Sequence, residues 1–269
     1  MTRTLPAGLS AIVEELELDQ PLVVTVADLA LLAERAGVAS PPKLIADRLR
    51  ERGWLLPTAT AGAFEFAPGA HAGAIGHGEP FLELLAALAK RPSLALAVCL
   101  GSALWAHDLI DRAPDMLEIA ASDRTRVPAG LVKSSRVVVF AAHIAPLTVR
   151  GAPVHRLATI LVHLAARPSQ VASWGAVADA LPSLVDAMDS EELDRELDHR
   201  PRSVRMRLAY LVHGVDPTLA DRLVSAVTER DSKVWFGPRG HLRRHNQRFG
   251  IADTLLPFDP ASLGRHGGS

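Results

Sequence analysis

The stretch from Thr25 to Phe66 constrains the fold most, because it predicts two short helices with a tight turn between them and a hairpin directly afterwards. Thr25 and Asp28 form a capping-box pattern at the start of the first helix, with Asp in place of the usual Glu. The following apolar residues share one helical face: Leu29, Leu32, Ala33 and Ala36. Gly37 ends this helix, since a residue without a Cβ adopts the left-handed cap conformation at least cost.

The second helix is predicted from Pro41 to Arg52, with Ser40 as its N-cap. One face of this helix is apolar and carries Pro42, Ile45, Ala46 and Leu49. The opposite face carries Lys43, Asp47 and Arg50, with Arg48 at its flank. The helix therefore packs on one side and presents charge on the other.

A hairpin follows the second helix. Trp54–Leu56 predicts one strand, 57–62 a loop of small residues, and Phe64–Phe66 the returning strand. Leu22–Val24 predicts a short strand that pairs with this hairpin, and Gly8–Leu18 predicts a preceding helix. This order of elements is typical of a winged helix-turn-helix, which reads DNA.

The predicted contact residues lie on or beside the second helix. Lys43 and Arg50 would reach base edges in the major groove, while Ser40 and Arg48 would hold phosphates. Asp47 and Arg52 complete the surface, which has four cations against two acids and a net charge of +2. The hairpin loop has no Lys or Arg, so it offers no cation for a minor-groove contact. The alternative interpretation is a small helical core with a solvated basic face.

The whole chain has a net charge of −1 and a pI near 6.8, so any nucleic-acid binding must be local. The single cysteine, Cys99, forms no internal disulfide, and this fits a reducing compartment. The N-terminus lacks a signal-peptide pattern, and the longest apolar run, 94–106, is too short to span a bilayer. We therefore expect a cytoplasmic protein with no membrane partner.

The remaining chain predicts a mixed α/β domain. Apolar patterns predict helices over 80–90 and 93–110, and then 158–166, 174–188 and 217–227. Strands are predicted over 116–120, 136–141, 147–150 and 154–157. The expected fold is α+β, with a winged helix-turn-helix domain at 1–78, a connecting helix at 79–92 and a C-terminal domain at 93–269.

Charge is unevenly distributed in the second half of the chain. Residues 186–198 have a net charge of −6, and four arginines follow within 200–207. The segment 233–248 is basic and contains no acid. Its arginines are candidates for binding a partner or an anion: Arg239, Arg243, Arg244 and Arg248.

Catalytic patterns are incomplete. Gly101-Ser102, followed by Asp115 and Glu118, suggests a nucleotidyltransferase, but two acids three apart on a strand face opposite sides and cannot share a metal ion. His107 with Asp111, and His241 with His245, have helical metal-ligand spacing without a completing cluster or the Glu of a zinc protease. We expect no catalytic residue, metal or cofactor, and a degenerate nucleotidyltransferase is the remaining enzyme hypothesis.

Several motifs resemble the AbiEi family, the antitoxins of type IV abortive-infection toxin–antitoxin systems. They are Arg50-Glu51-Arg52-Gly53-Trp54-Leu55-Leu56-Pro57, Phe64-Glu65-Phe66-Ala67-Pro68-Gly69, Gly101-Ser102-Ala103-Leu104-Trp105-Ala106-His107, Asp111-Arg112-Ala113-Pro114 and Trp235-Phe236-Gly237-Pro238-Arg239-Gly240. The resemblance implies an N-terminal domain that represses its own operon by binding inverted repeats in promoter DNA. It also implies a C-terminal domain that counteracts a nucleotidyltransferase toxin. An interaction module that binds a toxin, with DNA binding secondary, is the alternative.

Overall fold

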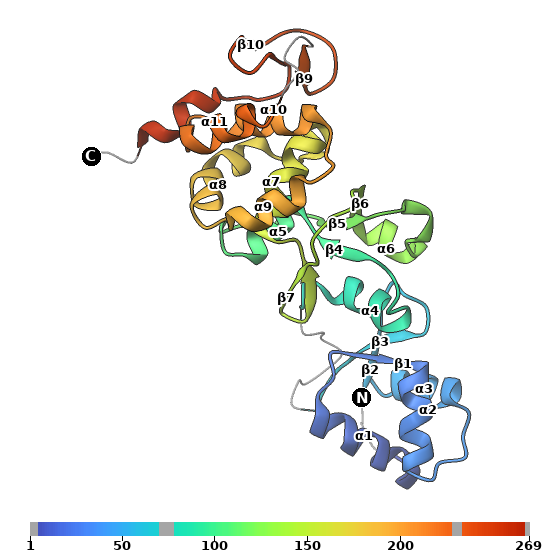
Figure 1. The fold of residues 1–269 in the computed structure, drawn as a ribbon. Helices are drawn as coiled ribbons and strands as arrows, with labels where there is room; N and C mark the ends of the chain where they lie inside the picture. The colour runs from blue at the N-terminus through green and yellow to red at the C-terminus, as the bar shows by residue number, and fades with distance from the viewer. Residues whose placement is uncertain (1–4, 70–77, 228–232, 267–269) are drawn as a thin grey trace. The chain divides into compact units, whose positions relative to one another are not determined.

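The computed structural model describes residues 5–69, 78–227 and 233–266. The chain divides into two compact units, one formed by residues 1–96 and 123–136 and the other by residues 97–122 and 137–269. Both units mix helices and strands (Figure 1), which confirms the predicted α+β class.

The first unit contains a winged helix-turn-helix. Its helices are α1 (Ala7–Asp19), α2 (Val26–Arg35) and α3 (Pro42–Glu51), and its strands are β1 (Val23–Thr25), β2 (Leu55–Pro57) and β3 (Ala63–Phe66). The three strands form an antiparallel sheet in the order β1-β3-β2, so the short strand before α2 pairs with the hairpin as predicted. Apolar side chains of α1, α2 and α3 pack with Trp54 and Phe66 in one core.

The predicted capping box of α2 is present. The Thr25 hydroxyl accepts from the Asp28 amide at 3.2 Å, and the Thr25 amide donates to the Asp28 carboxylate at 2.7 Å. Gly37 has a φ of +64°, as a helix-ending residue requires. Ser40, however, is not the N-cap of α3. Pro41 holds that position and Pro42 begins the helix, because Pro41 is extended with a ψ of 138°.

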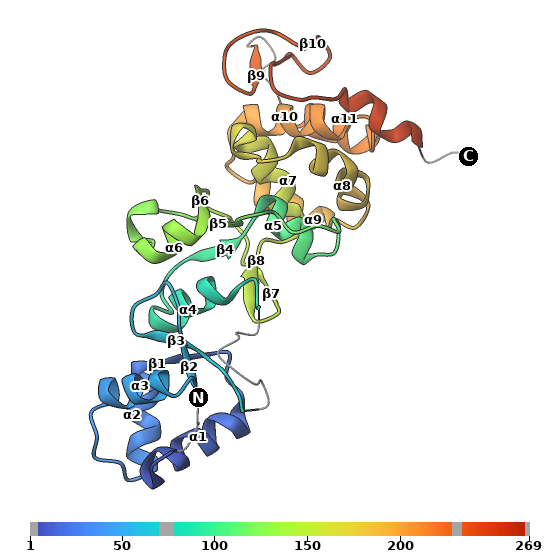
Figure 2. The same ribbon diagram turned by 180° about the vertical axis from the view of Figure 1, so that it is seen from behind.

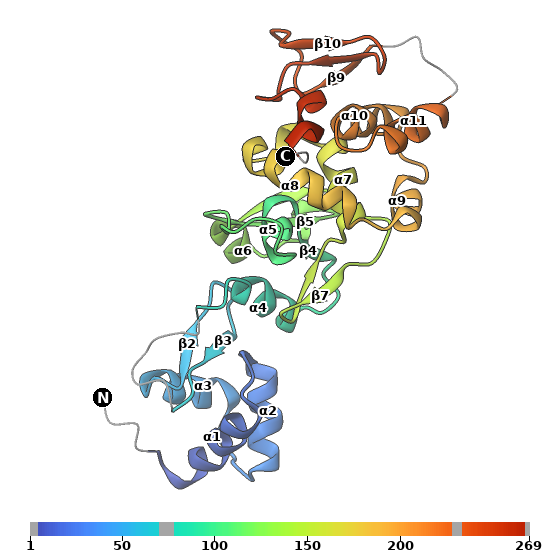
Figure 3. The same ribbon diagram turned by 90° about the vertical axis from the view of Figure 1, so that its left-hand side faces the viewer.

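Three further elements belong to the first unit: α4 (Leu82–Lys90), the 3₁₀ helix η1 (Arg124–Arg126) and α6 (Ala129–Ser134). The helix α4 was predicted, whereas η1 and α6 were not. A helix of six residues is too short to show an apolar periodicity. Figure 3 shows the hairpin β2–β3 extending from α3 toward α4.

The second unit corrects the prediction of one helix over 93–110. A strand, β4 (Leu96–Val98), and a separate helix, α5 (Leu100–Ala106), occupy this run. The backbone is extended at Cys99, with a φ of −141°, and left-handed at Leu100, with a φ of +48°, so no helix continues through them. A short apolar run of this kind fits a buried strand and a buried helix equally well.

The main sheet of the second unit has the strand order β6-β5-β4-β8-β7. Its other strands are β5 (Leu117–Ala121), β6 (Ser135–Val139), β7 (Leu147–Val149) and β8 (Ala152–Val154), each within three residues of its predicted limits. The predicted helices appear as α7 (Leu157–Ala166), α8 (Trp174–Asp186) and α11 (Pro217–Ser225). The helix pair α9 (Ser190–Leu197) and α10 (Arg202–Val212) was not predicted, because residues 186–207 were interpreted as two oppositely charged blocks and not for their helical period.

A small sheet ends the described part of the second unit. Its strands are β9 (Val234–Phe236), β10 (Arg244–Asn246) and β11 (Ile251–Asp253), in the order β10-β11-β9, with β11 and β9 parallel. They lie beside α10 (Figure 2), and the 3₁₀ helices η2 (Pro168–Gln170) and η3 (Pro260–His266) complete the unit. No described helix is long and apolar enough to cross a membrane.

Candidate nucleic-acid interface

The two faces of α3 differ as the sequence predicts. Ile45, Ala46 and Leu49 are buried in the core of the first unit. Lys43, Asp47 and Arg50 are exposed, while Arg48 is half-buried at the edge of this surface. The cationic side of the helix therefore faces away from the core of its own unit.

Arg50 is oriented by two neighbours. Its guanidinium lies 3.5 Å from the Asp47 carboxylate, and the two side chains are 44% and 61% exposed. It also lies 5.8 Å from the centroid of the Phe64 ring on β3. An ion pair this exposed contributes little and releases Arg50 readily to a phosphate or a base edge. Asp47 thus pairs with Arg50 on the exposed face of α3, and its role as a DNA contact stays a prediction.

Of the other two predicted contact residues, Arg52 has a local role in α3 and Ser40 has none. Arg52 donates to the Arg48 carbonyl at 3.0 Å, so it helps satisfy the C-terminal end of α3. Ser40 is half-buried and makes no hydrogen bond that caps α3, so its hydroxyl is not used by the helix.

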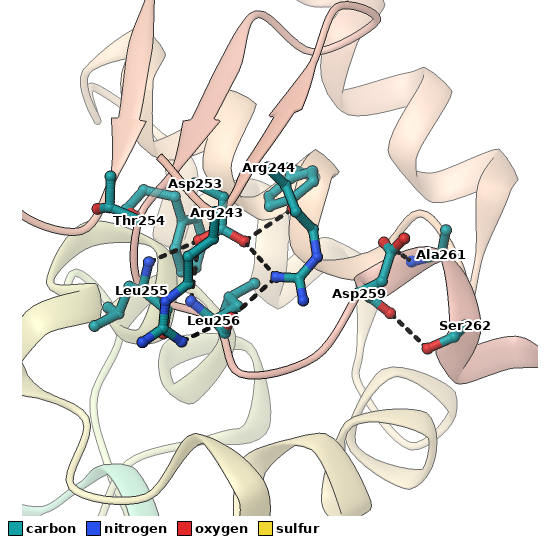
Figure 4. Close-up of polar contacts among 11 residues, drawn as sticks. Arg243, Arg244, Asp253, Thr254, Leu255, Leu256, Asp259, Ala261 and Ser262 are labelled. Atoms are coloured by element: carbon teal, nitrogen blue, oxygen red, sulfur yellow. Dashed lines mark hydrogen bonds and ion pairs between the residues drawn. The ribbon is translucent and has the colours of Figure 1, made fainter. Parts of the chain in front are cut away.

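The predicted partner-binding arginines of residues 239–248 do not form one free cluster. Arg244 donates to the buried Asp253 carboxylate at 3.2 Å and to the Leu256 carbonyl at 2.9 Å (Figure 4). Arg243 donates to the carbonyls of Leu255 and Leu256. These contacts hold β10 against the loop that follows β11.

Of the remaining two arginines, one has a charged partner and the other is exposed. Arg248 pairs with Asp221 of α11, whereas Arg239 is exposed in the loop after β9. Asp253 also accepts from the Tyr210 hydroxyl at 3.1 Å. Burial raises the pKa of Tyr210 well above its usual value, with the Asp253 carboxylate adding to the effect, so the phenol stays protonated as a donor. Most of the positive charge in this segment therefore has a structural use.

The nucleotidyltransferase-like residues of the second unit are arranged against each other. Glu118 is buried and accepts from the Gly101 amide at 2.7 Å and the Ser102 amide at 3.3 Å. The Ser102 hydroxyl in turn accepts from the Glu118 amide at 2.9 Å. The Gly-Ser amides that would hold a phosphate thus hold a carboxylate of the same chain.

Asp115 lies before β5 and is 93% exposed, so it does not join Glu118 at a shared metal position. The Nε2 atom of His107 lies 2.8 Å from the His155 carbonyl. This contact uses a ring nitrogen that the candidate metal site with Asp111 would need. His241 and His245 are both exposed. Within the described residues, no three His, Cys, Asp or Glu side chains gather at a distance suited to a metal ion.

Comparison with known proteins identifies one domain family. Residues 96–213 match the model of the AbiEi antitoxin C-terminal domain. The crystal structure of the RV2827C protein from Mycobacterium tuberculosis aligns with a TM-score of 0.79 and 28% sequence identity, covering 95% of this chain and 94% of that chain. No curated protein matches the sequence. Because the alignment covers 95% of this chain, the similarity extends over both units.

Proposed function

Because residues 96–213 match the AbiEi antitoxin C-terminal domain, we propose that this chain is an antitoxin that also represses its own operon. In this proposal the first unit binds inverted repeats in promoter DNA through α3. The second unit counteracts a nucleotidyltransferase-like toxin, by direct contact or by opposing its effect. The protein acts in the cytoplasm and has no enzymatic activity of its own.

The observation that carries the DNA-binding part is the exposed cationic face of α3. Lys43 and Arg50 project from a helix whose other face is anchored by Ile45 and Leu49 in the core. A rigid helix that presents cations away from its own unit has the geometry of a major-groove reader. Arg48 and Ser40 lie at the margin of this face, where phosphate contacts would fix its register on the duplex.

We expect the double variant Lys43→Ala with Arg50→Ala to weaken binding to the duplex directly upstream of the gene by about 30-fold or more. Each cation that contacts a base is worth about 1–3 kcal/mol. Gel shift and fluorescence anisotropy measure this loss, and circular dichroism checks that the variant remains folded. The matched control removes two exposed cations elsewhere, Arg35 of α2 and Arg195 of α9. Equal binding by the α3 variant and the wild type would refute α3 as the reader.

The occupied Gly101-Ser102 turn supports placing the catalytic acids on a partner chain. Glu118 occupies the amides of Gly101 and Ser102, and Asp115 is displaced to the surface. A Gly-Ser turn occupied in this way is not available to a triphosphate, which favours an antitoxin over a nucleotidyltransferase. Incorporation of labelled nucleotide by the purified protein with magnesium would contradict this part of the proposal.

We expect the full-length Lys43→Ala, Arg50→Ala variant, made from a constitutive promoter, to rescue cells from the neighbouring toxin as well as the wild type does. The two activities are assigned to different units, so a substitution confined to α3 leaves neutralisation intact. Colony counts after toxin induction measure rescue. Loss of rescue together with DNA binding would instead show that neutralisation acts through DNA.

A second candidate function is a toxin-binding module in which DNA binding is secondary. The candidate surfaces for it are the acidic block 186–198, which includes α9, and the late basic segment, in which Arg239 is exposed. This alternative predicts a stable complex of the purified chain with the toxin, and no change in operon transcription in the α3 variant.

A further inference from the structure

The hairpin loop of the first unit is packed against other elements of the same unit. Within the loop, the Thr58 hydroxyl donates to the Ala63 carbonyl at 2.9 Å. On one side, the Ala59 amide donates to the Glu83 carboxylate of α4 at 2.8 Å. A Cβ at Gly62 would lie only 3.1 Å from the Lys90 ammonium, so the end of α4 reaches the loop as well.

The helix α6 also contacts this loop. A Cβ built on Gly130 would lie 1.9 Å from the Ala59 carbonyl oxygen, a separation that no real side chain tolerates. Gly130 is therefore required by close contact between two backbones, and not by a left-handed φ. This contact places the segment 123–136 at the tip of the hairpin, about seventy residues from it in sequence.

The elements around the loop carry the positive charge that the loop lacks. Residues 123–136 have a net charge of +3. The elements α4, η1 and α6 carry four exposed cations, which we call the hairpin-side patch: Lys90, Arg124, Arg126 and Lys133. Arg126 lies 3.7 Å from Asp123 with the two side chains 81% and 47% exposed, so this pair barely neutralises it.

From this arrangement we infer that the hairpin-side patch is a second contact of the first unit with the phosphodiester backbone of duplex DNA. In a winged helix-turn-helix the hairpin lies beside the recognition helix, and here Arg50 of α3 already reaches Phe64 of β3. The same strand leads back to the loop that α4 and α6 hold. A duplex on α3 thus meets the cations of α4, η1 and α6 where a basic hairpin loop would otherwise meet it. This inference rests on the proposed DNA binding.

The test measures how binding depends on salt. The variant Arg124→Gln, Arg126→Gln, Lys133→Gln is compared with the wild type on the upstream duplex and on a duplex of random sequence, across a series of potassium chloride concentrations. Each phosphate contact contributes about 0.9 to the slope of log K against log salt. We expect the triple variant to lose about 2–3 from this slope on both duplexes, with the ratio of the two affinities unchanged.

A control with the same change in net charge carries Arg112→Gln, Arg195→Gln and Lys233→Gln, three exposed positions of the second unit. This control keeps the wild-type slope if the effect is local. Equal losses in both triple variants, or a wild-type slope in the hairpin-side variant, would overturn the inference. If the wild type binds neither duplex, both the proposed DNA binding and this inference fail. If only Lys43→Ala with Arg50→Ala reduces binding, the proposed function stands and this inference falls.

A second variant tests the placement of α6 while keeping every charge. Gly130→Ala favours the helix but forces α6 away from Ala59, so we expect it to lower the salt slope as well. Gly175→Ala is its match, because Gly175 is also near a helix start and its added Cβ would meet only the Ser173 hydroxyl at 3.9 Å. An unchanged slope in Gly130→Ala would show that the contact with the hairpin does not position the patch.

Discussion

Replacing Glu196 by alanine is expected to lower the free energy of unfolding of the second unit by about 3–5 kcal/mol. Glu196 is fully buried on α9 and pairs with the Arg200 guanidinium at 2.5 Å. It also accepts from the amides of His143 and Ile144 and from the Thr159 hydroxyl. Its removal leaves a cation only 14% exposed without its carboxylate, together with three donors that lose their acceptor.

Urea unfolding followed by tryptophan fluorescence measures this loss. Trp105, Trp174 and Trp235 lie in the second unit, so a Trp54→Phe background confines the signal to that unit. Asp194→Ala, on the same helix, is the control. Its ion pair with Arg222 is 59% and 44% exposed and is worth less than about 1 kcal/mol. A loss at Glu196 no larger than that at Asp194 would contradict the buried-charge argument.

Local sequence patterns were sufficient to predict the helices and strands of the first unit up to Phe66. The capping box at Thr25 and Asp28, the left-handed Gly37 and the apolar rings of Phe64 and Phe66 each act within a few residues, although Glu65 between the two rings is buried as well. The exposed face of α3 follows from helix geometry alone, which is why Lys43 and Arg50 could be placed correctly in advance. The one-residue error at Ser40 and Pro41 arose because either of two consecutive prolines can begin a helix.

Local sequence patterns could not predict contacts between residues far apart in the chain. The run 94–106 was predicted as one helix because no local signal marks Leu100 as left-handed. The position of α6 depends on the approach of Gly130 to Ala59, which a single sequence does not reveal. These are contacts whose partners are tens of residues apart.

The candidate binding arginines show that a sequence also does not reveal which partner a charged side chain binds. Net charge singled out the segment 233–248, but the partners of its arginines, Asp253 and Asp221, lie outside it. Likewise, the carboxylate that accepts from the Gly101 and Ser102 amides belongs to Glu118, which the sequence analysis considered only as a metal ligand and set aside. A charged residue in a pattern predicts the kind of contact, while the fold decides whether a neighbour or a ligand makes it.

Two buried histidines make the second unit sensitive to acid. His155 and His163 are 3% and 0% exposed, and the Phe140 ring stacks on His163 at 4.0 Å. Burial lowers the pKa of His155 to about 4, aided by Arg200, and the pKa of His163 to about 3, aided by His155. Both rings are neutral in the folded protein above these values, whereas in the unfolded chain they take up protons below about pH 6.5.

The unfolded state therefore binds more protons between about pH 6.5 and 4, and the free energy of unfolding falls as the pH drops through this window. At pH 5, about 1.5 units below the unfolded pKa, each histidine costs about 2 kcal/mol, so we expect a loss of about 4 kcal/mol from the pair relative to pH 7.5. The double variant His155→Gln with His163→Gln is less stable at pH 7.5 but loses much less on acidification, whereas His199→Gln, at a 90% exposed side chain, keeps the wild-type dependence. The measurement is fluorescence-detected urea unfolding at both pH values. A double variant as acid-sensitive as the wild type would mean that the buried carboxylates, and not these two rings, set the response to pH.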